Sequence, residues 1–255
     1  MPPAHPRDNV RGGSRMRPTV LMIMSASVDG RITTGPGRNV DEWSVRWPDR
    51  GAPQLLRTWL DRWGVDGVMS GSESVLIWSA HPAAAGAADH QGEPWPWPYI
   101  VFDGRGRITW GQTAGLIVVT RANVANAYRE QLGRQGIDTV WAGTGEHIDV
   151  GGALDQLYRR GFRRLALNGG GRLNGVFLRT GWVDELLVAW EPVLVGGETT
   201  PTIYDAADLA SPTSMIALER LGAGPGPGGS VWGHYHVLDH QHWQHVFRKI
   251  SCDYE

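Results

Sequence analysis

The sequence predicts an α/β protein with a mostly parallel central sheet, helices on both faces and an antiparallel C-terminal hairpin. Three observations predict it. Short apolar runs alternate with amphipathic segments of helical length, which is the pattern that buries a parallel sheet between helices. Small-residue or glycine-rich turns follow several of these runs, and after about residue 192 short extended pieces separated by proline and glycine replace the alternation. A chain of 255 residues accommodates one large domain, which we expect over residues 18–255.

Seven apolar runs are predicted as strands because each is short, rich in β-branched or aliphatic residues and bounded by turn residues. In chain order they are 18–26, 66–70, 98–102, 116–120, 137–142, 164–168 and 184–190. The segments between them are predicted as helices. Leu56, Trp59, Leu60 and Trp63, for example, recur at helical spacing. The helices are expected at 52–63, 123–135, 151–160 and 172–179, with a further short helix after Ser70, and 231–238 and 241–249 are expected to pair as the hairpin.

Composition excludes several classes of partner and site. A formal net charge of −2 gives no concentrated basic surface for nucleic acid, and no apolar run approaches the roughly 20 residues that cross a bilayer. Cys252 is the only cysteine, which excludes an intrachain disulfide and a cysteine-based zinc site and fits a cytoplasmic protein. Residues 1–17 are predicted as a disordered tail. The alternative is a secretory signal ending near Ser27, but its apolar part, Thr19 to Met24, is short.

The most suggestive turn is Asn168-Gly169-Gly170-Gly171, which lies between a predicted strand and a helix that begins with Arg172 and Leu173. Glycines let the backbone approach a ligand closely, and the free N–H groups of a helix's first turn favour an anion. A phosphate or pyrophosphate would fit here. The spacing differs from the Gly-x-Gly-x-x-Gly fingerprint of dinucleotide-binding folds, so a tight turn without a ligand is the competing interpretation.

Two further strand ends support a nucleotide site. The run Ser70-Gly71-Ser72-Glu73-Ser74 places small hydroxyl residues at the start of a helix, where Ser72 is also a natural N-cap. Thr120 and Arg121 follow another strand, and a hydroxyl with a guanidinium is suited to a phosphate. Lys249 is the only lysine, so phosphate contacts elsewhere would depend on arginine.

The first strand leads into Ser27-Val28-Asp29-Gly30, where Asp29 either begins a turn or places a carboxylate at the mouth of the sheet. Asp29 is the only acid we nominate as a proton donor. Trp43 and Trp47 lie in the following loop, and Trp47 is a candidate for stacking on a planar substrate.

Together these motifs resemble the riboflavin-pathway pyrimidine reductases, a family that includes the reductase half of the bacterial deaminase-reductase and has a dihydrofolate-reductase-like three-layer α/β/α fold. Besides the turns above, the resemblance is carried by Gly181-Trp182-Val183-Asp184-Glu185-Leu186 and Pro192-Val193-Leu194-Val195-Gly196-Gly197. It runs from about Pro18 to Tyr204. The order of motifs across 169–197 is its most specific part.

The resemblance implies NADPH along the carboxyl edge of the sheet, a small-molecule substrate near the first strand, and a homodimer. By position, the resemblance implies that the diphosphate and nicotinamide side of the cofactor is bound by Gly71, Ser72, Ser74, Gly169, Gly170, Gly171, Arg172 and Leu173. Ser25 and Ala26 would lie beside the nicotinamide. Thr120 and Arg121 would bind the adenosine 2′-phosphate. The substrate would be bound by Asp29, Thr33, Trp47 and Asn168.

Three departures leave the substrate open. The family commonly has a lysine on the first strand, a glutamate before the paired glycines and an Asp-Asp-Pro after the second turn, where this chain has Leu21-Met22-Ile23-Met24, Asn168 and Ala80-His81-Pro82. A site built for a polar substrate is strongly weakened when its partners are lost. We therefore keep three hypotheses: a reductase of a ribosylaminopyrimidine phosphate, a tailoring reductase of another planar C=N or C=O compound, and a non-catalytic nucleotide-binding module.

Five histidines crowd the C-terminal region: His234, His236, His240, His242 and His245. His-x-His on a strand places both rings on one face, as a metal site requires, but no acidic pattern completes the set. We expect no metal and an exposed or interface hairpin.

Overall fold

The computed structural model describes residues 16–38, 52–78, 96–111 and 113–238. Its strands are β1 (Thr19–Ser27), β2 (Gly67–Gly71), β3 (Tyr99–Phe102), β4 (Leu116–Thr120), β5 (Asp138–Trp141), β6 (Arg164–Leu167), β7 (Glu185–Glu191), β8 (Leu218–Pro225) and β9 (Val231–Val237). Its α-helices are α1 (Ala52–Trp63), α2 (Ser72–Trp78), α3 (Asn126–Arg134), α4 (Val150–Arg159) and α5 (Gly171–Arg179), and short 3₁₀ turns occupy Pro212–Ser214 and Pro227–Gly229.

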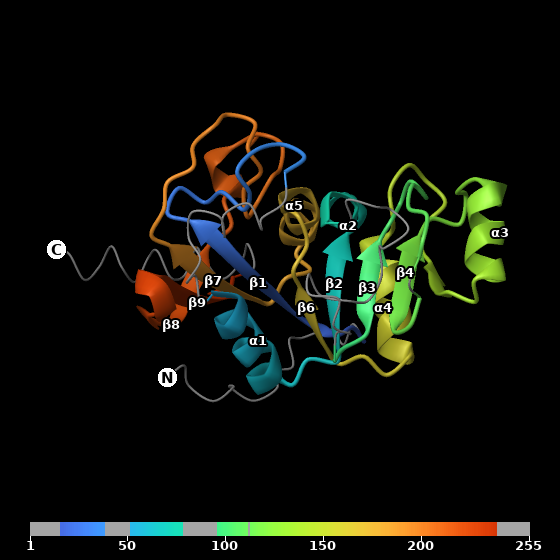
Figure 1. The fold of residues 1–255 in the computed structure, drawn as a ribbon, viewed down its shortest axis with the longest axis horizontal. Coiled ribbons are helices and arrows are strands. Elements are labelled where there is room, and N and C mark those ends of the chain that lie inside the picture. The colour runs from blue at the N-terminus through green and yellow to red at the C-terminus, as the bar shows by residue number, and fades with distance from the viewer. Residues whose placement is uncertain (1–15, 39–51, 79–95, 112, 239–255) are drawn as a thin grey trace.

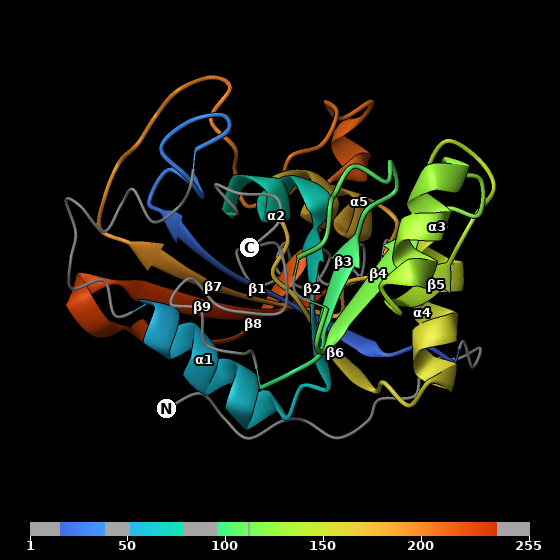
Figure 2. The ribbon, with the colours of Figure 1, turned by 45° about the vertical axis from the view of Figure 1, so that its right-hand side comes forward.

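The nine strands of the described residues form one sheet in the order β5-β4-β3-β2-β6-β1-β7-β9-β8. The first seven strands of this order, β5-β4-β3-β2-β6-β1-β7, are parallel to one another. Strand β9 pairs antiparallel with both β7 and β8. Figures 1 and 2 show α3 and α4 at the β4–β5 end of the sheet and β8 with β9 at the opposite end. The predicted fold class, a mostly parallel α/β sheet with an antiparallel finish, is confirmed.

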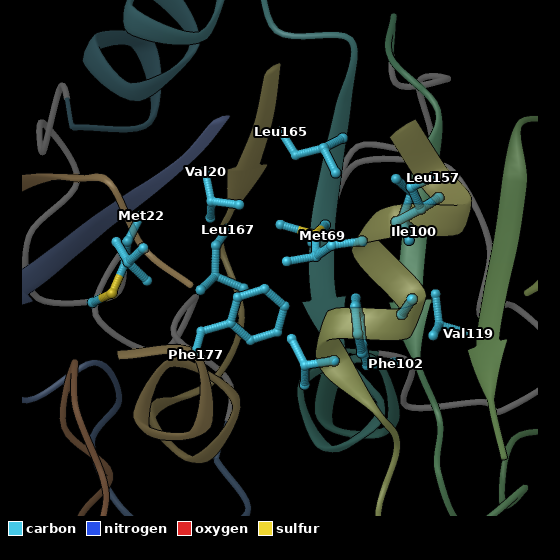
Figure 3. Close-up of a cluster of buried hydrophobic side chains, with 14 of the residues drawn as sticks. Val20, Met22, Met69, Ile100, Phe102, Val119, Leu157, Leu165, Leu167 and Phe177 are labelled. Atoms are coloured by element: carbon cyan, nitrogen blue, oxygen red, sulfur yellow. The ribbon is translucent and has the colours of Figure 1, made fainter. Parts of the chain in front are cut away.

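Helices cover both faces because alternate strand residues point to opposite sides. On one face, Leu154 and Leu157 of α4 and Phe177 of α5 pack on a core that includes Leu167 and Ile100. Figure 3 shows this cluster, in which the ring of Phe177 lies beside the central strands.

On the other face, Trp59 and Leu60 of α1 pack on Ile23 and Leu187, and α3 packs on the β3–β4 end through Tyr128 and its neighbours. The result is the three-layer arrangement that the resemblance implied.

The seven predicted strands from 18–26 to 184–190 begin and end within one residue of the observed ones, and the helix at 52–63 coincides with α1. The helix expected at 123–135 begins later, at Asn126, after Ala125 in an extended conformation. Ser72 was expected to precede α2 as a cap, but α2 begins at Ser72 itself.

Two predicted boundaries were wrong. Strand β9 pairs with β7 and with β8 (Leu218–Pro225), whereas the hairpin was expected between 231–238 and 241–249; the segment 241–249 lies outside the described residues. The reason is that β8 is an edge strand with mostly exposed side chains, so it carries no apolar alternation. Arg17 was assigned to a disordered tail, yet its guanidinium makes a two-bonded ion pair with Asp184; residues 1–15 lie outside the described residues.

Candidate functional site

The connections of the sheet change direction around β6. The chain leaves β1 and β2 through α1 and α2 toward one face, whereas it leaves β6, which lies between them, through α5 on the other face. Open α/β sheets bind ligands outside the carboxyl ends of their strands at such switch points. The topology therefore assigns the candidate site to the ends of β1, β2 and β6, where the sequence placed its motifs.

The three glycines after Asn168 serve two purposes. A Cβ on Gly170 would lie 2.9 Å from Ser74 Oγ, so this glycine lets the start of α5 approach α2. A Cβ on Gly171 would lie 2.2 Å from the main-chain oxygen of Thr202, and the Asp205 N–H donates to Gly171 O. Gly171 is therefore required for packing of the 202–205 loop. Gly170 is the better candidate for ligand approach.

Arginines surround the start of α2. Arg107 donates to Glu73 at 2.8 Å, and this hydrogen bond lowers the pKa of Glu73; the positive charges of Arg107, Arg172 and Arg105 act in the same direction. The three positive charges outnumber the single carboxylate, which leaves local positive charge at the start of α2, where Ser74 lies close to Gly170. Sequence reasoning missed Arg105 and Arg107, although their position directly after β3 resembles that of Arg121 after β4.

Thr120 and Arg121 have partners within the fold. Thr120 is buried and its hydroxyl donates to Asp103 O at 2.7 Å. Arg121 donates to the main-chain oxygens of Gly104 and Gly145, which ties the loops after β3 and β5 together. The buried Thr120 side chain offers no surface to a 2′-phosphate, so that part of the predicted contact is not supported.

The loop that carries Arg105 and Arg107 is held by Asp103. Its Oδ2 accepts hydrogen bonds from the Arg107 N–H and from the Tyr128 hydroxyl, each at 2.9 Å, and the Tyr128 oxygen accepts from Trp110 Nε1 at 3.0 Å. Burial raises the pKa of Tyr128, and the charge of Asp103 raises it further. This buried network fixes the position of the loop after β3 that carries the two arginines.

Asp29 anchors a loop. Its carboxylate accepts hydrogen bonds from the Ser27 hydroxyl at 2.5 Å, from the Gly196 N–H at 2.7 Å and from the Val195 N–H at 3.2 Å. These bonds, led by that from Ser27, lower the pKa of Asp29 to about 2. A group that stays ionised at neutral pH is a poor proton donor, so the geometry favours a loop-positioning role over the predicted acid.

The remaining predicted substrate residues are not gathered at one point. Asn168 is exposed, and its amide donates to the main-chain oxygen of Ile23 at 2.7 Å. Thr33 is buried, and its hydroxyl exchanges hydrogen bonds with the main chain of Gly35. Trp47, like Trp43, lies outside the described residues.

A second carboxylate stands at the end of β7. Glu191 is fully buried, and the hydroxyl of the half-buried Ser25 donates to its Oε1 at 3.0 Å. The parallel register places Ser27 opposite Glu191, so Ser25, Ser27 and Glu191 share the α1 face, whereas Ala26 is buried on the other face. Nothing in the sequence motifs singled out Glu191, because it reads as the polar end of a buried strand.

Residues 18–223 match the RibD C-terminal domain family. The chain belongs to this family. Among curated relatives, the 2,5-diamino-6-ribosylamino-4(3H)-pyrimidinone 5′-phosphate reductase of Aquifex aeolicus is 29% identical over 207 residues, covering 79% of this chain and 89% of the relative. The resemblance stated from the motifs is thereby confirmed at the level of the family.

Solved structures of the RibD family share the fold. RibD of Acinetobacter baumannii superposes with a TM-score of 0.64 at 17% identity, over 88% of this chain and 59% of that one. The deaminase/5-amino-6-(5-phosphoribosylamino)uracil reductase of Thermotoga maritima gives 0.58 at 14%, over 88% and 58%. This chain therefore spans about three fifths of the length of these two proteins.

The Val183-Asp184-Glu185 motif of this family member is structural. Asp184 accepts hydrogen bonds from Arg17 and from the Val20 N–H, and Glu185 contacts His234 at 2.6 Å in the core. Both lie at the amino end of β7, opposite the candidate site.

The described histidines of the C-terminal group have no metal-like surroundings. His234 is buried between Glu185 and the edge of the Trp63 ring, whereas the prediction was an exposed or interface hairpin. No group of three or more His, Cys, Asp or Glu side chains within the described ranges is arranged to hold a metal, and none of their helices is long and apolar enough to cross a membrane. His240, His242 and His245 lie outside those ranges.

Proposed function

We propose that this chain is an NADPH-dependent reductase that transfers a hydride to a ribosylaminopyrimidine 5′-phosphate. The observation that carries the proposal is the close approach of Gly170, at the start of α5, to Ser74 in the first turn of α2, where Arg107 binds Glu73 and the charge of Arg172 also acts on that carboxylate. Membership of a family whose curated relatives are named as reductases of this compound class supports it.

The residues at the switch point fit a dinucleotide. Gly170 leaves no side chain between the first turns of α5 and α2, so main-chain N–H groups can approach a diphosphate. Arg105, Arg107 and Arg172 supply the positive charge that a polyanion requires. We assign the phosphates to this group and a supporting role to Arg121, which braces the loops beside it.

NADPH supplies the hydride. The protein's task is then to align the substrate and exclude water, which accounts for much of the rate in such sites. Asp29 contributes by holding the 195–196 main chain against the end of β1. The proton that completes the reduction must come from a group other than ionised Asp29.

A tailoring reductase with a different planar substrate is the second candidate function. It is favoured by the first strand, where Met22 and Met24 are buried and no lysine is present, and by Asn168, whose amide is directed to the Ile23 main chain. In this alternative the cofactor site is the same and only the substrate differs.

Binding of NADPH is the first test. We expect NADPH to raise the melting temperature and to change its fluorescence on mixing, and Arg107→Ala and Arg172→Ala each to weaken binding by about tenfold through loss of a charged contact. Arg134→Ala, on an exposed turn of α3, is the matched control. No response to NADPH in either measurement would favour a non-catalytic module.

Turnover is the second test. NADPH consumption is measured with the pyrimidinone phosphate and with a panel of cyclic imines and dihydrofolate. If NADPH is consumed only with members of the panel, the tailoring reductase would replace the ribosylaminopyrimidine reductase as the proposed function. The homodimer and the cytoplasmic location remain predictions, and light scattering of the purified chain tests the first.

A further inference from the structure

The sequence contains two Asn-Gly pairs, Asn168-Gly169 and Asn174-Gly175. In such a pair the main-chain nitrogen of the glycine can attack the side-chain amide of the asparagine, because the glycine has no side chain to hinder the approach. This reaction is one reason why asparagine is a thermolabile residue in proteins. The structure places the two pairs in different surroundings, from which we expect very different reactivity.

The first pair lies in the turn between β6 and α5. The Asn168 side chain is exposed, and neither residue of the pair belongs to a helix or a strand. Among the described residues, the N–H of Gly169 has no hydrogen-bond acceptor, so its nitrogen is not committed to a partner. The Asn168 amide is restrained through Nδ2, which donates to Ile23 O at 2.7 Å.

The second pair provides an internal comparison. Asn174 is fully buried within α5. Its main-chain N–H donates to Gly170 O, and its Nδ2 donates to Ile203 O at 2.9 Å. Because the helix fixes the main chain and burial excludes water, we expect the Asn174-Gly175 pair to react only after this part of the molecule unfolds.

We propose that Asn168-Gly169 is a site of spontaneous deamidation that limits the lifetime of the cofactor site. The Gly169 nitrogen loses its proton to a solvent base and forms a bond to Asn168 Cγ, the Cγ–Nδ2 bond breaks, and ammonia leaves. Water then opens the cyclic imide at either of its carbonyl carbons. The products are aspartate and isoaspartate, and water is the only co-reactant.

Both products disturb the turn. Aspartate has no side-chain N–H to donate to Ile23 O, so the link between β6 and β1 is lost. Isoaspartate also lengthens the main chain before Gly169, which displaces the start of α5 where Gly170 approaches Ser74. We therefore expect the modified chain to be less stable and to bind NADPH more weakly. The second of these effects rests on the proposed function.

Local opening of the turn should control the rate. Gly169 is buried, and a Cβ on it would lie 2.9 Å from Leu173 Cδ2, so a base reaches the Gly169 nitrogen only when the turn opens. A ligand that binds the closed turn lowers the population of the open form. NADPH should consequently slow the reaction.

The test incubates the full chain in mildly alkaline buffer and follows the peptides that contain Asn168 and Asn174 by mass spectrometry, with isoaspartate detected by enzymatic methylation. We expect conversion at Asn168 to be at least about tenfold faster than at Asn174, because opening a turn costs less free energy than unfolding a buried helix. Saturating NADPH should slow conversion at Asn168 at least about threefold. The melting temperature and NADPH affinity should fall in step with the converted fraction.

Asn168→Gln is the matched control, since glutamine keeps an amide donor but its longer side chain cyclises far more slowly. The melting temperature of this variant should stay constant during the same incubation, whatever its starting value. Asn168→Asp gives the melting temperature of the aspartate product. If Asn168→Gln does not fold, the two rates in the wild type decide.

Equal rates at Asn168 and Asn174 would overturn the proposal, as would no conversion at Asn168 over a period that fully converts a synthetic peptide of residues 165–171. Conversion without loss of stability or NADPH affinity would overturn the effect on the cofactor site, and so would NADPH that binds without slowing the reaction. Absence of NADPH binding would instead overturn the proposed function, while the two rates measured without ligand still decide the deamidation.

Discussion

The side-chain amide of Asn168 donates a 2.7 Å hydrogen bond to the main-chain oxygen of Ile23. The registered pairs between β1 and β6 end at Met22 and Leu167, so this bond extends the contact between the two strands by one step. It does so where the chain departs from them toward opposite faces. Asn168 therefore links the carboxyl end of β6 to β1 at the switch point. An ionised carboxylate could not take this structural role, because it has no hydrogen to donate to the Ile23 oxygen.

Asn168→Asp should destabilise the fold. The substitution would replace an N–H donor by an oxygen that faces a carbonyl oxygen, and we expect the free energy of unfolding to fall by about 1–3 kcal/mol. Urea unfolding measures it. Asn123→Asp is the comparison, since Asn123 donates to Thr144 O in an exposed loop and should cost less. An equal or smaller loss in Asn168→Asp would contradict the role given to this bond.

Alanine substitutions should separate the two purposes of the glycine turn. A Cβ on Gly171 would meet main-chain and carboxylate oxygens of the 202–205 loop at 2.2–2.3 Å, so we expect Gly171→Ala to lose about 1–3 kcal/mol of unfolding free energy. A Cβ on Gly170 meets only Ser74 Oγ, the end of a rotatable side chain.

Gly170→Ala should consequently keep most of its stability but bind NADPH more weakly. Thermal melting and an NADPH titration of both variants check this pair. Equal stability of the two proteins would refute the packing role of Gly171.

The anchoring by Asp29 should depend on pH. Its pKa in the folded protein is about 2, below the ordinary value of 3.8, so its contribution to stability is complete above about pH 4 and is lost as the pH falls toward 2. The melting temperature of Asp29→Asn should therefore lie a few degrees below that of the wild type at pH 6, with the difference shrinking between pH 4 and 2.

Exposed Asp208→Asn is the control for Asp29 and should show no such convergence. A gap between wild type and Asp29→Asn that widens on acidification would have the wrong sign for this mechanism.

Tyr128→Phe should loosen the arginine loop. Removing the hydroxyl leaves Asp103 Oδ2 and Trp110 Nε1 each without one buried partner, which we expect to cost about 1–3 kcal/mol of unfolding free energy. Because Asp103 also binds the Arg107 N–H, NADPH affinity should fall too. Tyr158→Phe, on α4 away from this loop, is the control. If the Tyr128→Phe variant is less stable but binds NADPH as tightly as the wild type, the hydrogen-bond network around Asp103 does not position the cofactor site.

Local sequence predicted most elements because their signals are local. The run from Leu116 to Thr120 is buried from end to end and was recognisable as a strand, as was the helical spacing of α1. Strand β8 escaped because an edge strand exposes its side chains. Its true partner, β9, follows a tight turn in which Gly228 and Gly229 take positive φ, a run that reads equally well as a spacer.

The sequence by itself determined the fold class, the positions of the described strands other than β8, and the small residues at the ends of β2 and β6, since apolar periodicity and glycine turns act over a few neighbours. Only the tertiary structure decided what the individual residues at the strand ends contact. Thr120 is buried under Asp103, Gly171 faces Thr202, and Glu191 meets Ser25, and each partner is distant in the chain. Whether a side chain binds a ligand or the fold depends on which donor or acceptor packing brings to it.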